Sequence, residues 1–72
     1  MHRKVKLVEP LENYTLKVEF ADGCTEIIDI KPYINEFHAF KDLLIVDGLF
    51  EQVKVDSGGY GISWNDYIDL GF

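Results

Sequence analysis

The stretch YTLKVEFADGCTEIIDI, residues 14–30, has the clearest structural pattern in the chain. Apolar and polar side chains alternate from Tyr14 to Phe20, which is the period of a strand with one buried face. The tripeptide Ala21-Asp22-Gly23 interrupts the alternation, and a second β-rich run extends from Cys24 to Ile30. The stretch therefore predicts a β-hairpin with strands at residues 14–20 and 24–30.

The cross-strand pairs indicate the register of this hairpin. A two-residue turn at Asp22-Gly23 places Glu19 opposite Glu26, and like charges directly opposite each other are destabilising. A three-residue loop with Gly23 in the left-handed conformation instead pairs Leu16 with Ile28. We therefore expect the three-residue loop.

Shorter patterns predict the elements on either side of the hairpin. Residues 5–8 are typical of a first strand that ends at Glu9-Pro10. Pro32 suits the first position of a short helical turn that continues to Glu36. We expect residues 37–46 to be irregular, with a turn near Phe40–Leu43.

The C-terminal third predicts a second hairpin. Asp47 is a candidate N-cap for one helical turn at residues 48–51. Residues 52–55 and 60–64 read as two strands, and residues 68–70 as a short last strand. The sum is an α+β fold with a small antiparallel β-sheet built from two hairpins plus an N-terminal strand, and with short helical turns between the hairpins. We expect a single domain over residues 1–72.

Length and composition exclude several classes of protein. Seventy-two residues are too few for two domains, and no apolar run approaches the ~20 residues that span a bilayer. Cys24 is the only cysteine, so neither an internal disulfide nor a CxxC metal site is available. A lone thiol fits the reducing cytoplasm, where we expect the protein. We expect no cofactor.

The charge is unevenly distributed along the chain. The chain has thirteen acidic and seven basic residues, which gives a net charge of −6. Arg3, Lys4 and Lys6 lie in the first six positions, so the remainder is strongly acidic. Such a surface repels phosphate backbones. Direct contact with nucleic acid is therefore disfavoured, and Arg3, Lys4 and Lys6 are the only candidates for a phosphate-binding arm.

Catalytic and metal-binding groupings are weak in this sequence. Nucleophilic catalysis needs a base beside the nucleophile, and nothing brings His2 or His38 next to Cys24. Asp56, Asp66 and Asp69 could surround a hard cation, but the calcium-loop pattern is absent, and positions in turns and on the surface explain these residues better. We expect no enzymatic activity and no metal.

Two groups of residues are candidates for contacting a partner. The first is the aromatic and acidic group Trp64, Asp66, Tyr67 and Asp69, because Trp and Tyr are enriched at the energetic centres of interfaces. Alternatively, Trp64 is the core anchor of a small domain. The second group is Leu44, Val46 and Leu49, because a fold of this size has little interior to cover so many apolar side chains.

The order and spacing of several short segments resemble those of a family of small bacterial proteins, domain-of-unknown-function family 2442. The similarity rests on these segments: 5–8, 14–20 followed by Asp22-Gly23, Asp29-Ile30-x-Pro32, Leu49-Phe50-x-x-Val53 and, most specifically, GYGISWND at 59–66 with Ile68-Asp69-Leu70. Many members have proline after the tryptophan, where this chain has Asn65. Family chains also usually continue several residues beyond Leu70.

The resemblance implies no established enzymatic activity. It implies genes that often neighbour those of a second uncharacterised family, number 4160, in an arrangement like that of toxin–antitoxin pairs.

Three functional hypotheses follow. The first is a non-enzymatic protein-interaction module, in the form of an antitoxin-like or regulatory partner subunit, that binds a basic toxin-like protein or a second copy of itself. The second is regulation linked to nucleic acid, through the basic N-terminal arm or through a DNA-binding partner. The third is a small-ligand-binding domain or minor enzyme near Trp64, Asp66 and Asp69.

Overall fold

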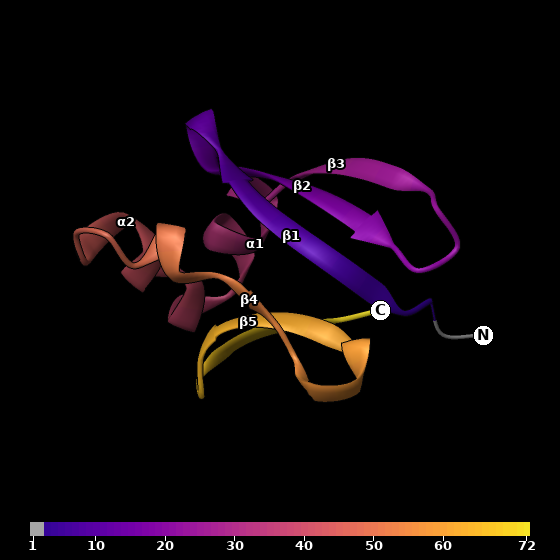
Figure 1. The fold of residues 1–72 in the computed structure, drawn as a ribbon. Helices are drawn as coiled ribbons and strands as arrows, with labels where there is room; N and C mark the ends of the chain where they lie inside the picture. The colour runs from indigo at the N-terminus through magenta and orange to yellow at the C-terminus, as the bar shows by residue number, and fades with distance from the viewer. Residues whose placement is uncertain (1–2) are drawn as a thin grey trace.

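The computed structural model describes residues 3–72, which form two three-stranded antiparallel sheets and a helical segment between them (Figure 1). The first sheet has the order β1 (Val5–Leu11), β2 (Thr15–Phe20), β3 (Thr25–Asp29). The second has the order β4 (Lys54–Val55), β5 (Gly61–Asn65), β6 (Ile68–Gly71). The expected α+β class is confirmed, with the strands divided between two sheets. His2, considered above as a base, lies outside the described residues.

The first hairpin has the expected loop and register. Leu16 pairs with Ile28, and the backbone N–H of Phe20 donates to the carbonyl of Cys24 at 2.8 Å. Gly23 adopts a φ of +92°, which glycine tolerates without steric cost. The N–H of Cys24 donates to the Asp22 carboxylate at 2.9 Å. This bond holds the pKa of Asp22 below its usual value.

Strand β1 extends beyond the predicted end at Glu9-Pro10. It continues to Leu11, and Pro10 pairs with Leu16 of β2. Proline lacks the N–H that a central strand needs, but an edge strand tolerates it. Because β1 has hydrogen-bonded pairing on one side only, Pro10 does not end the strand.

The segment between the sheets contains more helix than the sequence predicts. Helix α1 (Lys31–Glu36) has Pro32 in its first turn, as expected. The segment predicted to be irregular contains a 3-10 turn (His38–Lys41) and α2 (Asp42–Ile45). The next turn is Phe50–Gln52, and its N-cap is Leu49 without a side-chain bond. The prediction of Asp47 as N-cap is therefore wrong, because the turn begins three residues later.

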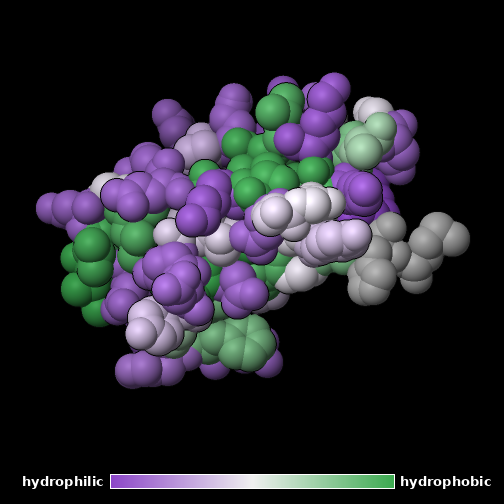
Figure 2. All heavy atoms as spheres, turned by 60° about the horizontal axis from the view of Figure 1, so that its bottom comes forward, coloured by the Kyte–Doolittle hydropathy of each residue, from purple (hydrophilic) through white to green (hydrophobic). Residues whose placement is uncertain are grey.

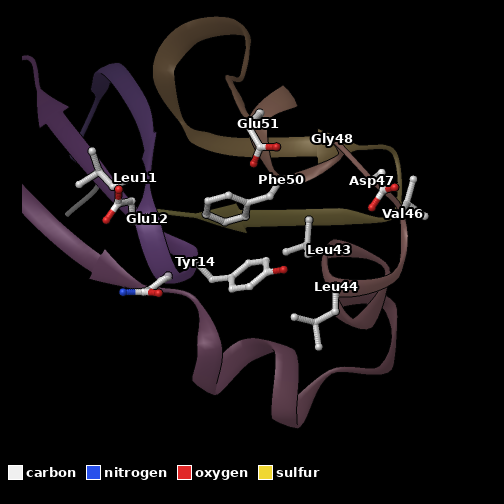
Figure 3. Close-up of a pocket in the computed structure, with 11 residues that line it drawn as sticks. Leu11, Glu12, Tyr14, Leu43, Leu44, Val46, Asp47, Gly48, Phe50 and Glu51 are labelled. Atoms are coloured by element: carbon white, nitrogen blue, oxygen red, sulfur yellow. The ribbon is translucent and has the colours of Figure 1, made fainter.

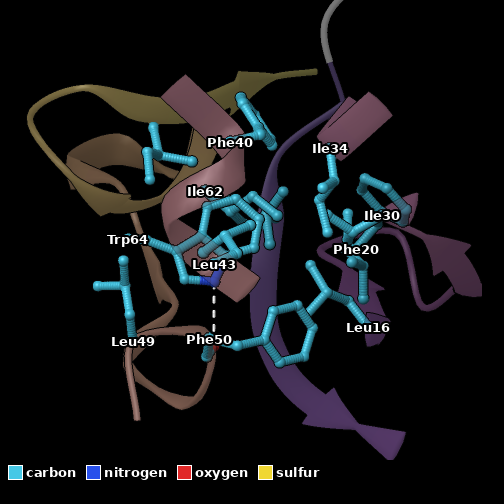
Figure 4. Close-up of a cluster of buried hydrophobic side chains, with 13 residues drawn as sticks. Leu16, Phe20, Ile30, Ile34, Phe40, Leu43, Leu49, Phe50, Ile62 and Trp64 are labelled. Carbon is cyan, nitrogen blue, oxygen red and sulfur yellow. Dashed lines mark hydrogen bonds between the residues drawn. The ribbon is translucent and has the colours of Figure 1, made fainter. Parts of the chain in front are cut away.

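The core lies between the two sheets and the helical segment (Figure 4). Trp64 is only 4% exposed, and its ring stacks on Phe50 and meets Phe40 edge-on. The indole Nε1–H donates to the carbonyl of Phe50 at 3.0 Å, which satisfies a polar group that would be costly to bury unpaired. Trp64 therefore joins the second sheet to the helical segment. None of the described helices has the length and apolar content to cross a membrane.

Candidate functional site

A groove of about 300 Å³ opens between the β1–β2 connection and the segment that follows α2 (Figure 3). Its floor is formed by Tyr14, Leu43 and Phe50. Further apolar side chains line it at Leu11, Leu44 and Val46. All three are partly exposed. Glu12, Asp47 and Glu51 add three carboxylates to the lining, which Asn13 and Gly48 complete. We call this site the acidic groove.

An unusual backbone conformation directs Tyr14 into this groove. Asn13 and Tyr14 have φ values of +60° and +57°, and asparagine adopts this left-handed region more readily than tyrosine. Three contacts hold the turn: Thr15 Oγ1 donates to the Glu12 carbonyl, Lys31 Nζ donates to the Asn13 carbonyl, and the N–H of Ile30 donates to the Tyr14 carbonyl. Strained conformations of this kind persist only where their surroundings fix them, and they cluster at functional sites.

The floor of the groove is continuous with the core. The Tyr14 ring meets Phe50 edge-on, with centroids 5.2 Å apart, and Phe50 in turn stacks on the buried Trp64. Aromatic pairs in such arrangements add to the stability gained from burial. The floor is therefore rigid, and a ligand would meet a preformed apolar surface.

The electrostatic character of the lining is uniformly negative. Glu12, Asp47 and Glu51 are all exposed, and no Lys or Arg of residues 3–72 lines the groove. Lys31 lies close to it, but its ammonium group is bound to the Asn13 carbonyl at 2.7 Å and to Asp29 at 3.0 Å. The arrangement suits an occupant that carries both apolar surface and positive charge.

A second hollow of about 290 Å³ lies beside the β5–β6 hairpin. Its lining is largely apolar and aromatic: Phe37, Ala39, Phe40, Tyr67, Asp69 and Leu70. Tyr67 is 83% exposed and lies in a turn held by the Asn65 side chain, which accepts the N–H groups of Tyr67 and Ile68.

The predicted partner-contact residues divide among four places. Leu44 and Val46 line the acidic groove, whereas Tyr67 and Asp69 line the second hollow. Asp66 is exposed in the turn between β5 and β6. Trp64 and Leu49 are buried. The assignment of Leu49 to a partner surface is therefore wrong, and for Trp64 the alternative of a core anchor is confirmed: both side chains fill the core.

One run of consecutive exposed apolar side chains lies at α2 and directly after it. Figure 2 shows hydrophobic side chains at the left end of the molecule, where Figure 1 places α2. Leu44, Ile45 and Val46 are all exposed there, Ile45 most of all at 73%. The sequence-based expectation of uncovered apolar surface is thus met at this end of the molecule.

The basic N-terminal residues are largely engaged within the chain. Arg3 pairs with Glu26, and its guanidinium lies 3.7 Å from the centroid of the Phe20 ring. The hydrogen bond to Glu26 raises the pKa of Arg3. Lys6 lies 3.5 Å from Glu19. These contacts reduce the charge that Arg3 and Lys6 could offer to a phosphate.

The candidate metal ligands are dispersed. Within residues 3–72, no group of three or more His, Cys, Asp and Glu side chains is arranged to hold an ion. Asp56 instead accepts a hydrogen bond of 2.6 Å from the Ser63 hydroxyl and so joins β5 to the turn before it. Cys24 is exposed at the hairpin loop.

Several groove residues were not singled out from the sequence. The sequence places Tyr14 in the strand pattern, Asp47 at a helix N-cap and Glu51 in the turn that follows. It gives Glu12 and Asn13 no role. Asn13 was the one available signal, because asparagine tolerates the left-handed conformation that turns the chain here. The meeting of residues 11–14 with residues 43–51 has no local signature in the sequence.

The fold and the groove together define a small two-sheet α+β protein with a preformed acidic and apolar surface. The family model described as "Protein of unknown function (DUF2442)" matches residues 5–72. The chain belongs to this family. No curated protein and no solved structure was found to match it.

Proposed function

We propose that this protein is a non-enzymatic interaction module that binds a basic segment of a partner protein in the acidic groove. The observation that carries the proposal is the composition of the lining: a fixed apolar floor at Tyr14, Leu43 and Phe50 with carboxylates at Glu12, Asp47 and Glu51. An amphipathic segment with lysine or arginine on its polar side complements both features.

The partner we propose is a basic protein of the toxin-like class, with this chain as its antitoxin-like or regulatory subunit. The net charge of −6 supports rapid association with such a partner, because complementary fields accelerate encounter. Binding would also cover the apolar surface at Leu44 and Val46. The exposed, unpaired Cys24 suits a reducing compartment, and we propose the cytoplasm.

Capture from the source cells tests this proposal. A tagged wild-type chain is compared with the double variant Leu44→Ser/Val46→Ser, which removes apolar lining without touching the core. Ile45→Ser is the matched control, because Ile45 lies between the two residues and is exposed but does not line the groove.

We expect the wild type and Ile45→Ser to retain one basic protein and the double variant to lose it. Loss with Ile45→Ser alone, or equal retention by all three chains, would contradict binding in the groove. Unfolding curves of the three chains verify that each is folded.

A further inference from the structure

We propose that β3 pairs antiparallel with β3 of a second copy of this chain, so that the first sheets of two molecules join into one continuous sheet. This inference is independent of the acidic groove. It rests on the free edge of β3, on the composition of that strand and on the charges that self-pairing brings together.

The outer edge of β3 carries unpaired backbone groups. Among the strands of the described residues, β3 lies at one end of its sheet, next to β2 only. Figure 1 shows it on the side remote from β4 and β5. Along an antiparallel strand, the backbone groups of one residue bond to the neighbouring strand and those of the next residue point away from it. The Cys24 carbonyl accepts from Phe20 of β2, and the Ile30 N–H donates to Tyr14 immediately before β2. Thr25, Ile27 and Asp29 therefore direct their N–H and carbonyl groups outward.

The two edges of this sheet differ in their protection. Strand β1 contains Pro10 and a register irregularity between Val5 and Leu7, and it lies against the second sheet. Proline and bulges are devices that prevent edge-to-edge pairing. The sequence of β3, TEIID, has no proline, glycine or lysine, and its pairing with β2 is regular. Ile27 is 63% exposed on it.

One register of self-pairing uses the whole strand. When the two-fold axis passes at Ile27, Ile27 faces its own copy and Thr25 faces Asp29 of the second chain. Each facing pair can exchange backbone hydrogen bonds, and no acid lies directly opposite an acid. Moving the axis to Glu26 places two glutamates opposite each other. The Ile27-centred register is therefore preferred, because it uses all three outward-facing residues of the strand and avoids the repulsion between the two glutamates.

Glu26 needs separate consideration because it lies on the inner face of the sheet. An inward-pointing charge on an edge strand usually discourages pairing. Here Arg3 of the same chain pairs with the Glu26 carboxylate, and in the Ile27-centred register Glu26 faces Ile28. The charge that would oppose association is thus neutralised within each copy.

The interface is small, so the dimer forms and dissociates with concentration. Each copy also carries −6, and salt screens the repulsion between copies. Self-association should therefore strengthen as salt is raised. Binding of a basic segment in the acidic groove should weaken under the same change.

Amide hydrogen exchange and molecular mass, both measured over a range of protein concentration, test the proposal. We expect the amides of Thr25, Ile27 and Asp29 to gain protection as the mass approaches that of a dimer. The amides of Glu26 and Ile28 already bond to β2 and should not change. A mass that stays monomeric, or a dimer without protection at those three amides, would overturn the proposal.

Ile27→Pro provides the matching variant because it removes an outward N–H that the monomer does not use. Two such groups are lost per dimer, and we expect association about thirtyfold weaker. Protection at Glu26 and Ile28 verifies that the hairpin remains folded.

Ile27→Val, which keeps the N–H, and Tyr67→Ser, which alters the second hollow, should both dimerise as the wild type does. Loss of the dimer with Tyr67→Ser would assign the interface to the second hollow and overturn pairing through β3.

Discussion

Tyr14 links the turn between β1 and β2, the acidic groove and the core. Its backbone adopts a left-handed conformation, its carbonyl accepts a hydrogen bond from Ile30, and its ring contacts Phe50 at the floor of the groove. Phe50 provides the carbonyl that accepts the indole N–H of Trp64. A short chain of contacts therefore fixes the candidate site directly to the core.

Trp64→Phe should destabilise the protein by about 1–3 kcal/mol, because it removes a buried hydrogen bond and part of an aromatic contact. The measurement is urea unfolding followed by circular dichroism. Tyr67→Ala, in the same hairpin but exposed, should change stability by less than about 0.5 kcal/mol. Equal losses for the two variants would contradict the assignment of Trp64 to the core.

Asp22 should make the first hairpin sensitive to acid. The N–H of Cys24 lowers the pKa of Asp22 in the folded state. The stabilisation is therefore complete above the unfolded pKa of about 3.9 and is lost as the pH falls through the lower, folded pKa.

Asp22→Asn keeps a side-chain oxygen but does not titrate. The free energy of unfolding of this variant should depend less steeply on pH below about pH 4 than that of the wild type. Parallel pH profiles for the two chains would contradict this role of Asp22.

At the scale of elements, local pattern predicts the first hairpin well and the segment 37–53 poorly. The register of residues 15–29 follows from alternation and from the charges of Glu19 and Glu26, which are all local. Helix α2 has only one turn, too short for a period to be visible in the sequence. Its position depends on the burial of Leu43 among residues distant in the chain, which no local pattern encodes.

The contact between β1 and the turn before β5 depends on Gly59. Its φ is +77°, and a Cβ there would lie 2.7 Å from the Val5 carbonyl oxygen. Gly59→Ala should therefore lower stability by about 2–4 kcal/mol through strain and a backbone clash.

Gly71→Ala is the matched control for Gly59→Ala, because a Cβ at Gly71 meets nothing within 4 Å. Thermal unfolding of both variants provides the comparison. A loss for Gly71→Ala as large as that for Gly59→Ala would contradict the close approach described here.

At the scale of the whole molecule, the sequence predicts the chemical character of the binding surface better than its location. Surplus apolar content and acidic charge indicated an apolar and acidic binding face, and Leu44 and Val46 do line such a groove. The sequence also offers Leu49 and Trp64 for that surface, with a core position as the alternative for Trp64, and the molecule buries both. Composition measures how much apolar surface exists, whereas the packing of distant segments determines which side chains remain uncovered.

The central claim is that the acidic groove binds a basic and apolar segment, and a peptide titration followed by NMR chemical shifts tests it most directly. The probe is a short amphipathic peptide of lysine and leucine, with a glutamate and leucine peptide as control. We predict saturable shifts at residues 11–14 and 43–51 for the lysine peptide only, with affinity that falls as salt is raised. Absent shifts, shifts centred on β3 or the second hollow, or equal binding of the glutamate peptide would contradict the account.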